Sequence, residues 1–243
     1  MSDLLTLALL AGASFLAALV SASLSVGGGY VLFGATTLLY PLPAAIALQP
    51  ALSYASLVAR AVTFRQAITW RIVRPFTLGS LVGVAAGLAL YHTIPERALA
   101  LGVGAMMLVL SWAQMPMRHI QSQPGMAGVG VAHGMSGTVL GMGSVLQPVL
   151  LNSGIDRRAL VGTFASCLLV LEAIRAGGYA ITGFAYAPYA AAIAIATVAG
   201  FAGTWCGKQL IGHIPEEKFR IIMRLLVSAL ALRLIWTGMM GAD

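Results

Sequence analysis

The sequence predicts an all-α polytopic membrane protein made of two inverted-topology repeats, and three observations lead to this prediction. Hydrophobic residues make up 59% of the 243 positions and charged residues only 9%, with a mean hydropathy of +0.91. One water-soluble core cannot hide that much apolar surface. Apolar runs close to the length of a spanning helix, roughly 20 residues, recur along the chain, and short motifs recur between its halves. We therefore expect about eight to ten helical membrane segments.

Each long apolar run is interpreted as one membrane helix. The first run is expected to be retained rather than cleaved as a signal peptide, because Asp3 and no Lys or Arg precedes it. The runs are Leu4–Ala22, Ala44–Phe64, Phe76–Tyr91, Ala98–Met115, Gly125–Leu140, Leu160–Tyr179, Ala187–Cys206 and Phe219–Trp236.

The charge and cysteine patterns argue against other classes. A net charge of +7 and a pI near 9.9 would suggest nucleic-acid binding in a soluble domain, but the basic residues cluster in short loops, as cytoplasmic anchors do. Cys167 and Cys206 lie inside apolar runs, which suits buried small side chains better than a disulfide or a metal site. We expect a lipid bilayer around the chain and no nucleic acid, cofactor or metal.

An internal repeat is clearest late in each half. "TIPER" at Thr93–Arg97 matches "HIPEEK" at His213–Lys218, so that Pro95 pairs with Pro215. Each proline opens a helix with an acid in the first turn, where a missing N–H and a negative charge are tolerated. The same offset relates two glycine pairs whose small-xxx-small spacing lets membrane helices approach closely. These pairs are Gly83 with Gly87, and Gly203 with Gly207.

The early part of each half also repeats. "SVGGGYVLFG" at Ser25–Gly34 is similar to "GMGSVLQP" at Gly141–Pro148. We therefore divide the chain into a first transmembrane repeat, residues 1–120, and a second, residues 121–243. Each repeat is expected to contain a Gly-broken helical hairpin followed by three transmembrane helices.

Loop charges set the expected orientation of the repeats. The loop after Phe64 is basic, whereas the equivalent loop of the second half, residues 179–189, is uncharged; the loops after the Gly segments show the opposite pattern. The basic residues are Arg65, Arg71 and Arg74 in the first half, and Arg157 and Arg158 in the second. Since Lys and Arg favour the cytoplasmic side, the repeats are inverted and both termini lie outside. Inverted repeats with interrupted helices are typical of secondary transporters.

The Gly-rich breaks predict a binding site for an anion. The apolar run after Gly29 ends near Leu39, and the run after Gly143 ends near Leu151, so neither crosses the bilayer as a straight helix. The first N–H groups of a short helix lack intrahelical partners and carry the positive end of its dipole. The alternative is that the glycines only permit close packing or a tight hairpin. The residues assigned to the site are Gly27, Gly28, Gly29 and Tyr30 with Gly143, Ser144 and Val145.

Several side chains near these breaks are further candidates. Arg60 and Arg175 lie in apolar runs and could attract an anion; the alternatives are snorkelling for Arg60 and an ion pair with Glu172 for Arg175. Glu172 and His133 could carry a coupling proton, although structural pairing and packing are the more common roles. Gln49, Gln147, Ser53 and Ser166 are candidate hydrogen-bond partners of an oxyanion, or equally of neighbouring helices.

The repeated motifs resemble a known family. "SVGGGYVLFG" followed by "PLPAAIALQPALSYASLVARA", and "GMGSVLQPVLLNSGIDRRALVGTFAS" in the second half, look like the paired signatures of the TauE/SafE family of anion exporters, part of the TSUP superfamily. The resemblance covers nearly the whole chain. It implies a multi-pass protein of the bacterial plasma (inner) membrane that exports sulfite, a sulfonate or another small organosulfur or carboxylate anion. The motifs depart from the family pattern at Ser25, Gly34, Ser144 and Val145.

The leading interpretation is a secondary transporter that exports sulfite or a related organosulfur or sulfonate anion. The anion would bind between the two Gly-broken half-helices and move by alternating access. A passive anion channel with the same dipoles stays open as an alternative. An intramembrane enzyme is less favoured, because none of the four His residues has HExxH spacing and no GxSxG motif is present. The exact anion, coupling to H⁺ or Na⁺ and homo-oligomerisation are left open.

Overall fold

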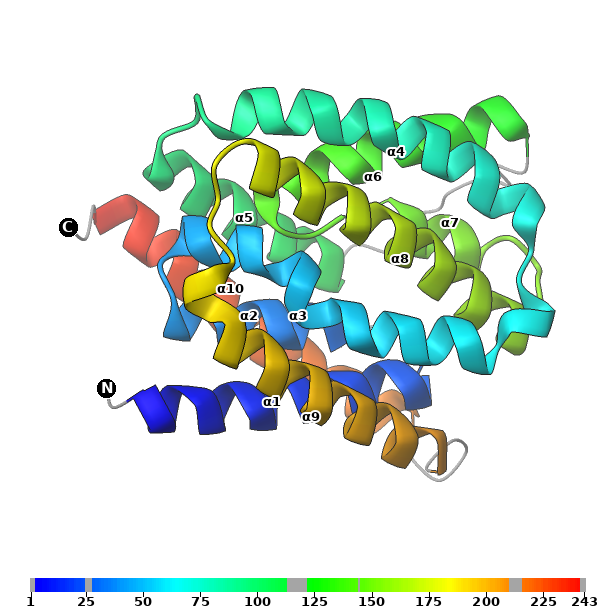
Figure 1. Ribbon diagram of the computed structural model, residues 1–243, viewed down its shortest axis with the longest axis horizontal. Coiled ribbons are helices and arrows are strands. Elements are labelled where there is room, and N and C mark those ends of the chain that lie inside the picture. Colours follow the sequence, from blue (N-terminus) through cyan, green and yellow to red (C-terminus); the bar gives the residue numbers. More distant parts are fainter. Residues whose placement is uncertain (1–2, 25–27, 113–121, 144, 210–215, 241–243) are drawn as a thin grey trace.

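The computed structural model describes residues 3–24, 28–112, 122–143, 145–209 and 216–240, and these form a bundle of helices with no strand among them (Figure 1). The helices of the first half are α1 (Asp3–Leu24), α2 (Gly28–Leu39), α3 (Leu42–Thr63), α4 (Trp70–Tyr91) and α5 (Glu96–Trp112). Those of the second half are α6 (Gln123–Leu140), α7 (Leu146–Leu151), α8 (Arg157–Ile181), α9 (Ala190–Gln209) and α10 (Glu216–Met240). Two short 3₁₀ helices, η1 (Arg65–Ala67) and η2 (Ala187–Tyr189), precede α4 and α9.

The predicted all-α membrane class is confirmed. Within the described ranges, five helices are long and apolar enough to cross a membrane: α1, α3, α4, α8, and α9 together with η2. The runs assigned from Ala98, Gly125 and Phe219 are also helical, as α5, α6 and α10. The two short segments predicted after the Gly-rich breaks are α2, with 12 residues, and α7, with 6.

Two helices begin earlier than expected. The helix assigned from Phe76 begins at Trp70, so Arg71 and Arg74 lie on the first turns of α4 and not in a loop. The helix assigned from Leu160 begins at Arg157, so Arg157 and Arg158 lie on the first turn of α8. Long basic side chains extend from a helix end to the polar headgroups, so the apolar run alone marks the helix start too late.

Local sequence explains where several helices begin and end. The Ser122 side chain accepts a hydrogen bond from the Gly125 N–H at 3.3 Å and caps α6, and Asp156 caps α8 by accepting from the Ala159 N–H at 3.0 Å. Gly141 ends α6 with φ of 76°, a left-handed conformation that favours glycine. An added Cβ there would also collide with the Phe33 ring.

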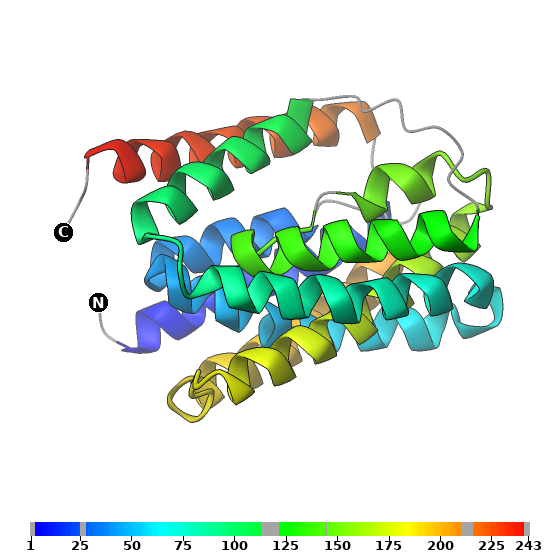
Figure 2. The ribbon, with the colours of Figure 1, turned by 90° about the horizontal axis from the view of Figure 1, so that it is seen from above.

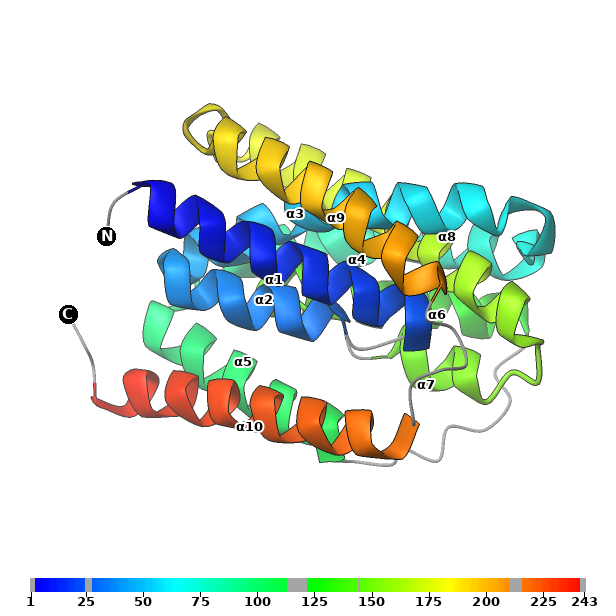
Figure 3. The same cartoon turned by 90° about the horizontal axis from the view of Figure 1, so that it is seen from below.

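The helices of the two halves are interleaved. Helix α4 packs along α6, α1 packs along α9, and α3 packs against α8 (Figure 3). The fourth helix of each half therefore lies on the first helix of the other half. Helices α5 and α10 form a further pair along one edge, as Figure 2 shows.

Glycines account for the closeness of the interleaved pairs. Any side chain at Gly83 of α4 would collide with the carbonyl group of Val131 in α6, and any side chain at Gly203 of α9 would collide with that of Phe15 in α1. Small residues let membrane helices approach to backbone contact in this way. The small-xxx-small spacing seen in the sequence therefore serves packing within one chain.

The chain ends and the turns lie at the two opposite ends of the bundle. Both termini lie at one end of the bundle, together with the turn between α4 and α5 (Figure 1). The turn between α3 and α4 and the beginning of α8 lie at the opposite end, so the basic residues of the two halves share one end. This arrangement agrees with the expected placement of both termini on the same side.

The apolar core has two main clusters. One joins α2, α3, α5 and α10 around Phe33, Ile46 and Met107, and the other joins α4, α6, α7 and α8 around Phe76 and Leu146. Cys167 is fully buried in the second cluster and Cys206 is partly buried, and both are free thiols.

Candidate functional site

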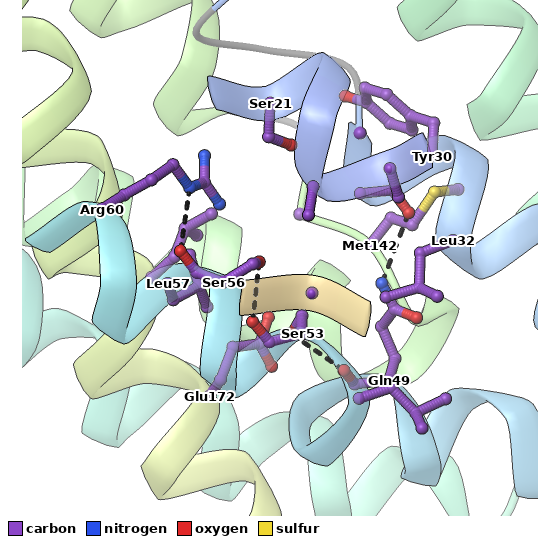
Figure 4. Close-up of a pocket in the computed structure, with 18 of the residues that line it drawn as sticks. Ser21, Tyr30, Leu32, Gln49, Ser53, Ser56, Leu57, Arg60, Met142 and Glu172 are labelled. Atoms are coloured by element: carbon purple, nitrogen blue, oxygen red, sulfur yellow. Dashed lines mark hydrogen bonds between the residues drawn. The ribbon is translucent and has the colours of Figure 1, made fainter. Parts of the chain in front are cut away.

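A cavity of about 100 Å³ lies among α1, α2, α3 and the segment that joins α6 to α7 (Figure 4). Helix α8 adds Phe164, Leu168 and Glu172 to the wall, and α9 adds Gly200. The cavity therefore collects residues from both halves of the chain, including many of the residues singled out in the sequence.

The first turn of α2 forms one wall. Gly28, Gly29 and Tyr30 all line the cavity, and as the first residues of the helix their N–H groups have no partner within it. The two glycines differ in the space around them. A Cβ at Gly28 would collide with the Ala17 carbonyl of α1, whereas a Cβ at Gly29 would meet no atom within 4 Å. Gly27 lies outside the described residues.

One face of α3 forms the opposite wall. Gln49, Ser53, Ser56 and Arg60 follow the spacing i, i+4, i+7, i+11 and share this face, and all four line the cavity. A chain of hydrogen bonds links them (Figure 4): Ser53 Oγ donates to the Gln49 carbonyl at 2.9 Å, Ser56 Oγ to the Ser53 carbonyl at 3.0 Å, and Arg60 Nε to the Ser56 carbonyl at 3.2 Å. The side chains of Ser53, Ser56 and Arg60 are therefore fixed to the backbone of α3, and together with Gln49 they form a polar stripe along this helix.

At the two ends of this stripe, Arg60 has no carboxylate partner and one atom of Gln49 has no hydrogen-bond partner among the described residues. Arg60 is only 5% exposed, and no carboxylate of the described residues lies within ion-pair distance of it. Gln49 Nε2 donates to the Gly29 carbonyl at 3.3 Å, but Gln49 Oε1 is buried and has no hydrogen-bond partner. Buried polar groups without a partner are uncommon and point to a ligand or an ordered water.

The second Gly-rich break differs from the first. His133 of α6 accepts a hydrogen bond at Nδ1 from the Leu146 N–H at 3.1 Å, which caps the beginning of α7. Because Nδ1 accepts, the neutral ring carries its proton on Nε2. A Cβ at Gly143 would collide with this ring, so Gly143 makes room for the imidazole. The side chain of His133 thus occupies the end of α7 where the sequence suggested an anion.

Glu172 and Arg175 form an ion pair, which was the alternative to anion binding considered for Arg175 from the sequence. Glu172 Oε2 accepts from Arg175 Nη1 at 2.7 Å, and the side chains are 10% and 1% exposed. Glu172 lines the cavity and Arg175 does not. Arg175 Nε and Nη2 are buried without a hydrogen-bond partner.

The structure thus brings together most but not all of the residues selected from the sequence. Val145 packs in the apolar cluster around α7 and is not part of the cavity wall, and Ser166 donates to the Gly162 carbonyl one turn back on α8. Ser144 lies outside the described residues. The selected residues that line the cavity are Gly28, Gly29, Tyr30, Gln49, Ser53, Arg60, His133, Gly143, Gln147 and Glu172.

Sequence reasoning missed the contribution of α1. Ser14 and Ser21 line the cavity, and Ser14 Oγ is buried without a hydrogen-bond partner. The available signal was two serines seven residues apart in an apolar run, a spacing that places both on one helix face.

The interleaved bundle, its interrupted helices and the polar cavity inside it define a helical membrane transport protein. The model of the sulfite exporter TauE/SafE family matches residues 10–234, and the chain belongs to this family. No curated protein and no solved structure matches the chain. Transport of a small anion across a membrane is therefore the function at the level of the family, and the chain is an integral multi-pass membrane protein.

Proposed function

We propose that this protein is a secondary transporter that exports a small anion of the sulfite or sulfonate class, and that the cavity between α2 and α3 is its binding site. The observation that carries the proposal is that the first turn of an interrupted helix lines the same cavity as Arg60, which has no carboxylate partner among the described residues. Free N–H groups at a helix start and a guanidinium both favour an anion.

The energetic argument concerns Arg60. A guanidinium stays charged even in apolar surroundings, so its burial is costly unless an anion or polar groups compensate. Its Nε has the Ser56 carbonyl as partner, and no carboxylate of the described residues supplies the negative charge. A bound anion would supply that counterpart.

The size of the cavity favours a small anion. A cavity needs roughly 10–15 Å³ of such space to hold one water molecule, so a cavity of about 100 Å³ suits a small ligand. Sites for drug-sized ligands occupy roughly 300–1,000 Å³. Sulfite and the shortest sulfonates therefore fit the proposal better than large organic anions.

We further propose that residues 1–120 and 121–243 are inverted repeats that rock against each other around this site. The order of long, short, long, long and long helices in each half supports the proposal, as does the reciprocal packing of α4 on α6 and of α9 on α1. Glu172 and His133 also line the cavity, and they are the groups we propose for any coupling proton, although each already holds a bond described above.

The test is uptake of radiolabelled sulfite into proteoliposomes under imposed pH and Na⁺ gradients. Gly29→Leu adds a side chain where a Cβ has open space, so it should narrow the cavity without a clash and reduce uptake at least about tenfold. Gly12→Leu is the matched control, since Gly12 is an exposed helical glycine on α1 that also has open space around it and does not line the cavity.

Equal loss of uptake in the two variants would mean that the transported anion does not bind in this cavity. Absence of saturable flux of any anion under every gradient would reject the transporter itself, and flux that rises without saturation would favour the channel.

A further inference from the structure

We propose that the cavity selects an anion that carries a hydrogen-bond donor of its own, and that Gln49 accepts from this donor. The inference rests on the proposed function, because it takes the cavity as the anion site. It narrows the substrate class from any small oxyanion to a singly charged one that keeps an O–H or N–H group.

The orientation of the Gln49 amide is fixed by its neighbour. The Gly29 carbonyl can only accept a hydrogen bond, so the amide nitrogen of Gln49 must face it, and Nε2 donates to it at 3.3 Å. The amide oxygen is then turned away from Gly29. Gln49 is 5% exposed, lines the cavity, and its Oε1 has no hydrogen-bond partner. An acceptor buried in this way calls for a donor from whatever fills the cavity.

The rest of the α3 face is also poor in free donors. The hydroxyl protons of Ser53 and Ser56 point to backbone carbonyls of their own helix, at 2.9 Å and 3.0 Å, so their lone pairs are what remains for a ligand. Donors lie on the facing wall, at the first turn of α2, and at the far end of the stripe in Arg60. The α3 wall therefore offers acceptors from Gln49 to Ser56, while the donors named above lie at the first turn of α2 and at Arg60.

This arrangement discriminates between oxyanions by their protons. An anion that has lost all its protons presents only lone pairs, which the α2 N–H groups and Arg60 accept well but which Gln49 Oε1 would face without a hydrogen bond. A hydrogen oxyanion such as hydrogen sulfite, or a sulfonate with a hydroxyl group, can satisfy both walls at once. A site built to bond a substrate hydroxyl rejects the analogue that lacks it.

Ethanesulfonate and isethionate (2-hydroxyethanesulfonate) form a matched pair of probes, since they share the sulfonate and the charge and differ by one hydroxyl group. Each is titrated as a competitor of labelled sulfite uptake by the wild-type protein in proteoliposomes. We expect isethionate to compete at a concentration about fivefold lower or less, the factor that one net hydrogen bond supplies. Gln49→Met should bring the ratio close to one, whereas Gln66→Met, the same change at an exposed glutamine in η1 outside the cavity, should keep it.

Equal competition by the two probes at the wild-type protein would overturn the inference while leaving the anion site intact, because a water molecule would then satisfy Gln49. Retention of the preference in a folded Gln49→Met variant would also overturn it. If sulfite itself is not transported, the proposed function fails and this inference fails with it. The wild-type comparison needs no variant, so the inference stays testable even if Gln49→Met does not fold.

Discussion

Replacing Glu172 with glutamine should leave Arg175 as a buried charge without a counter-charge. Their atoms Oε2 and Nη1 are 2.7 Å apart, and Arg175 Nε and Nη2 are buried without a hydrogen-bond partner. Removing one member of a buried ion pair typically costs about 3–5 kcal/mol. The glutamine carbonyl can still accept one hydrogen bond, so we expect a loss near the lower limit, about 3 kcal/mol. At roughly 2–4 °C per kcal/mol for a chain of this size, the melting temperature should fall by about 6–12 °C.

The assay is thermal unfolding in detergent of the wild-type protein, Glu172→Gln, Arg175→Met and the double variant. Arg175→Met should cost less than Glu172→Gln, because a buried carboxylate can take up a proton whereas a guanidinium cannot lose one. The double variant removes both charges and should melt above Glu172→Gln. A Glu172→Gln variant that melts within about 2 °C of wild type, or a double variant whose loss equals the sum of the single losses, would refute the reasoning.

Two further predictions concern the cavity wall. Gly143→Ala should force the His133 imidazole away from the beginning of α7 and lower the melting temperature by an amount equivalent to about 1–3 kcal/mol. The control is Gly128→Ala, at a helical glycine with open space, which should not lower the melting temperature. Equal melting temperatures of the two variants would contradict this role of Gly143. Arg60→Gln removes the buried charge and should raise the KM for sulfite uptake at least about tenfold; an unchanged KM in a folded variant would mean that Arg60 only extends to the membrane surface.

Sequence reasoning found the helices because their signal is local. In the described residues each apolar run corresponds to a helix, and the two Gly-rich breaks mark the beginnings of α2 and α7. Helices α4 and α8 begin earlier than the apolar runs, because arginines on their first turns look like loop residues when the position of the membrane surface is unknown. Local composition therefore predicts the helices well and their polar ends less well.

The site could be predicted only in part, since its chemistry depends on which distant residues meet. The two breaks look alike in sequence, yet His133 caps one and the other opens into the cavity. The spacing of Gln49, Ser53 and Arg60 could be read along the chain, but the carbonyl that orients the Gln49 amide lies on another helix. Contacts of that kind arise from tertiary packing and leave no trace in local spacing.

The reciprocal packing of α4 on α6 and of α9 on α1 has a consequence for biogenesis. Helix α1 ends at Leu24 and its partner α9 begins only at Ala190, so α1 is made long before the helix on which it packs. Helix α1 can pack against α9 only when almost the entire chain has been synthesised, because α9 is the ninth of the ten described α-helices. Assembly of this protein is therefore completed only when the last segments insert, and a chain cut short before α9 would leave α1 without the surface that holds it in place.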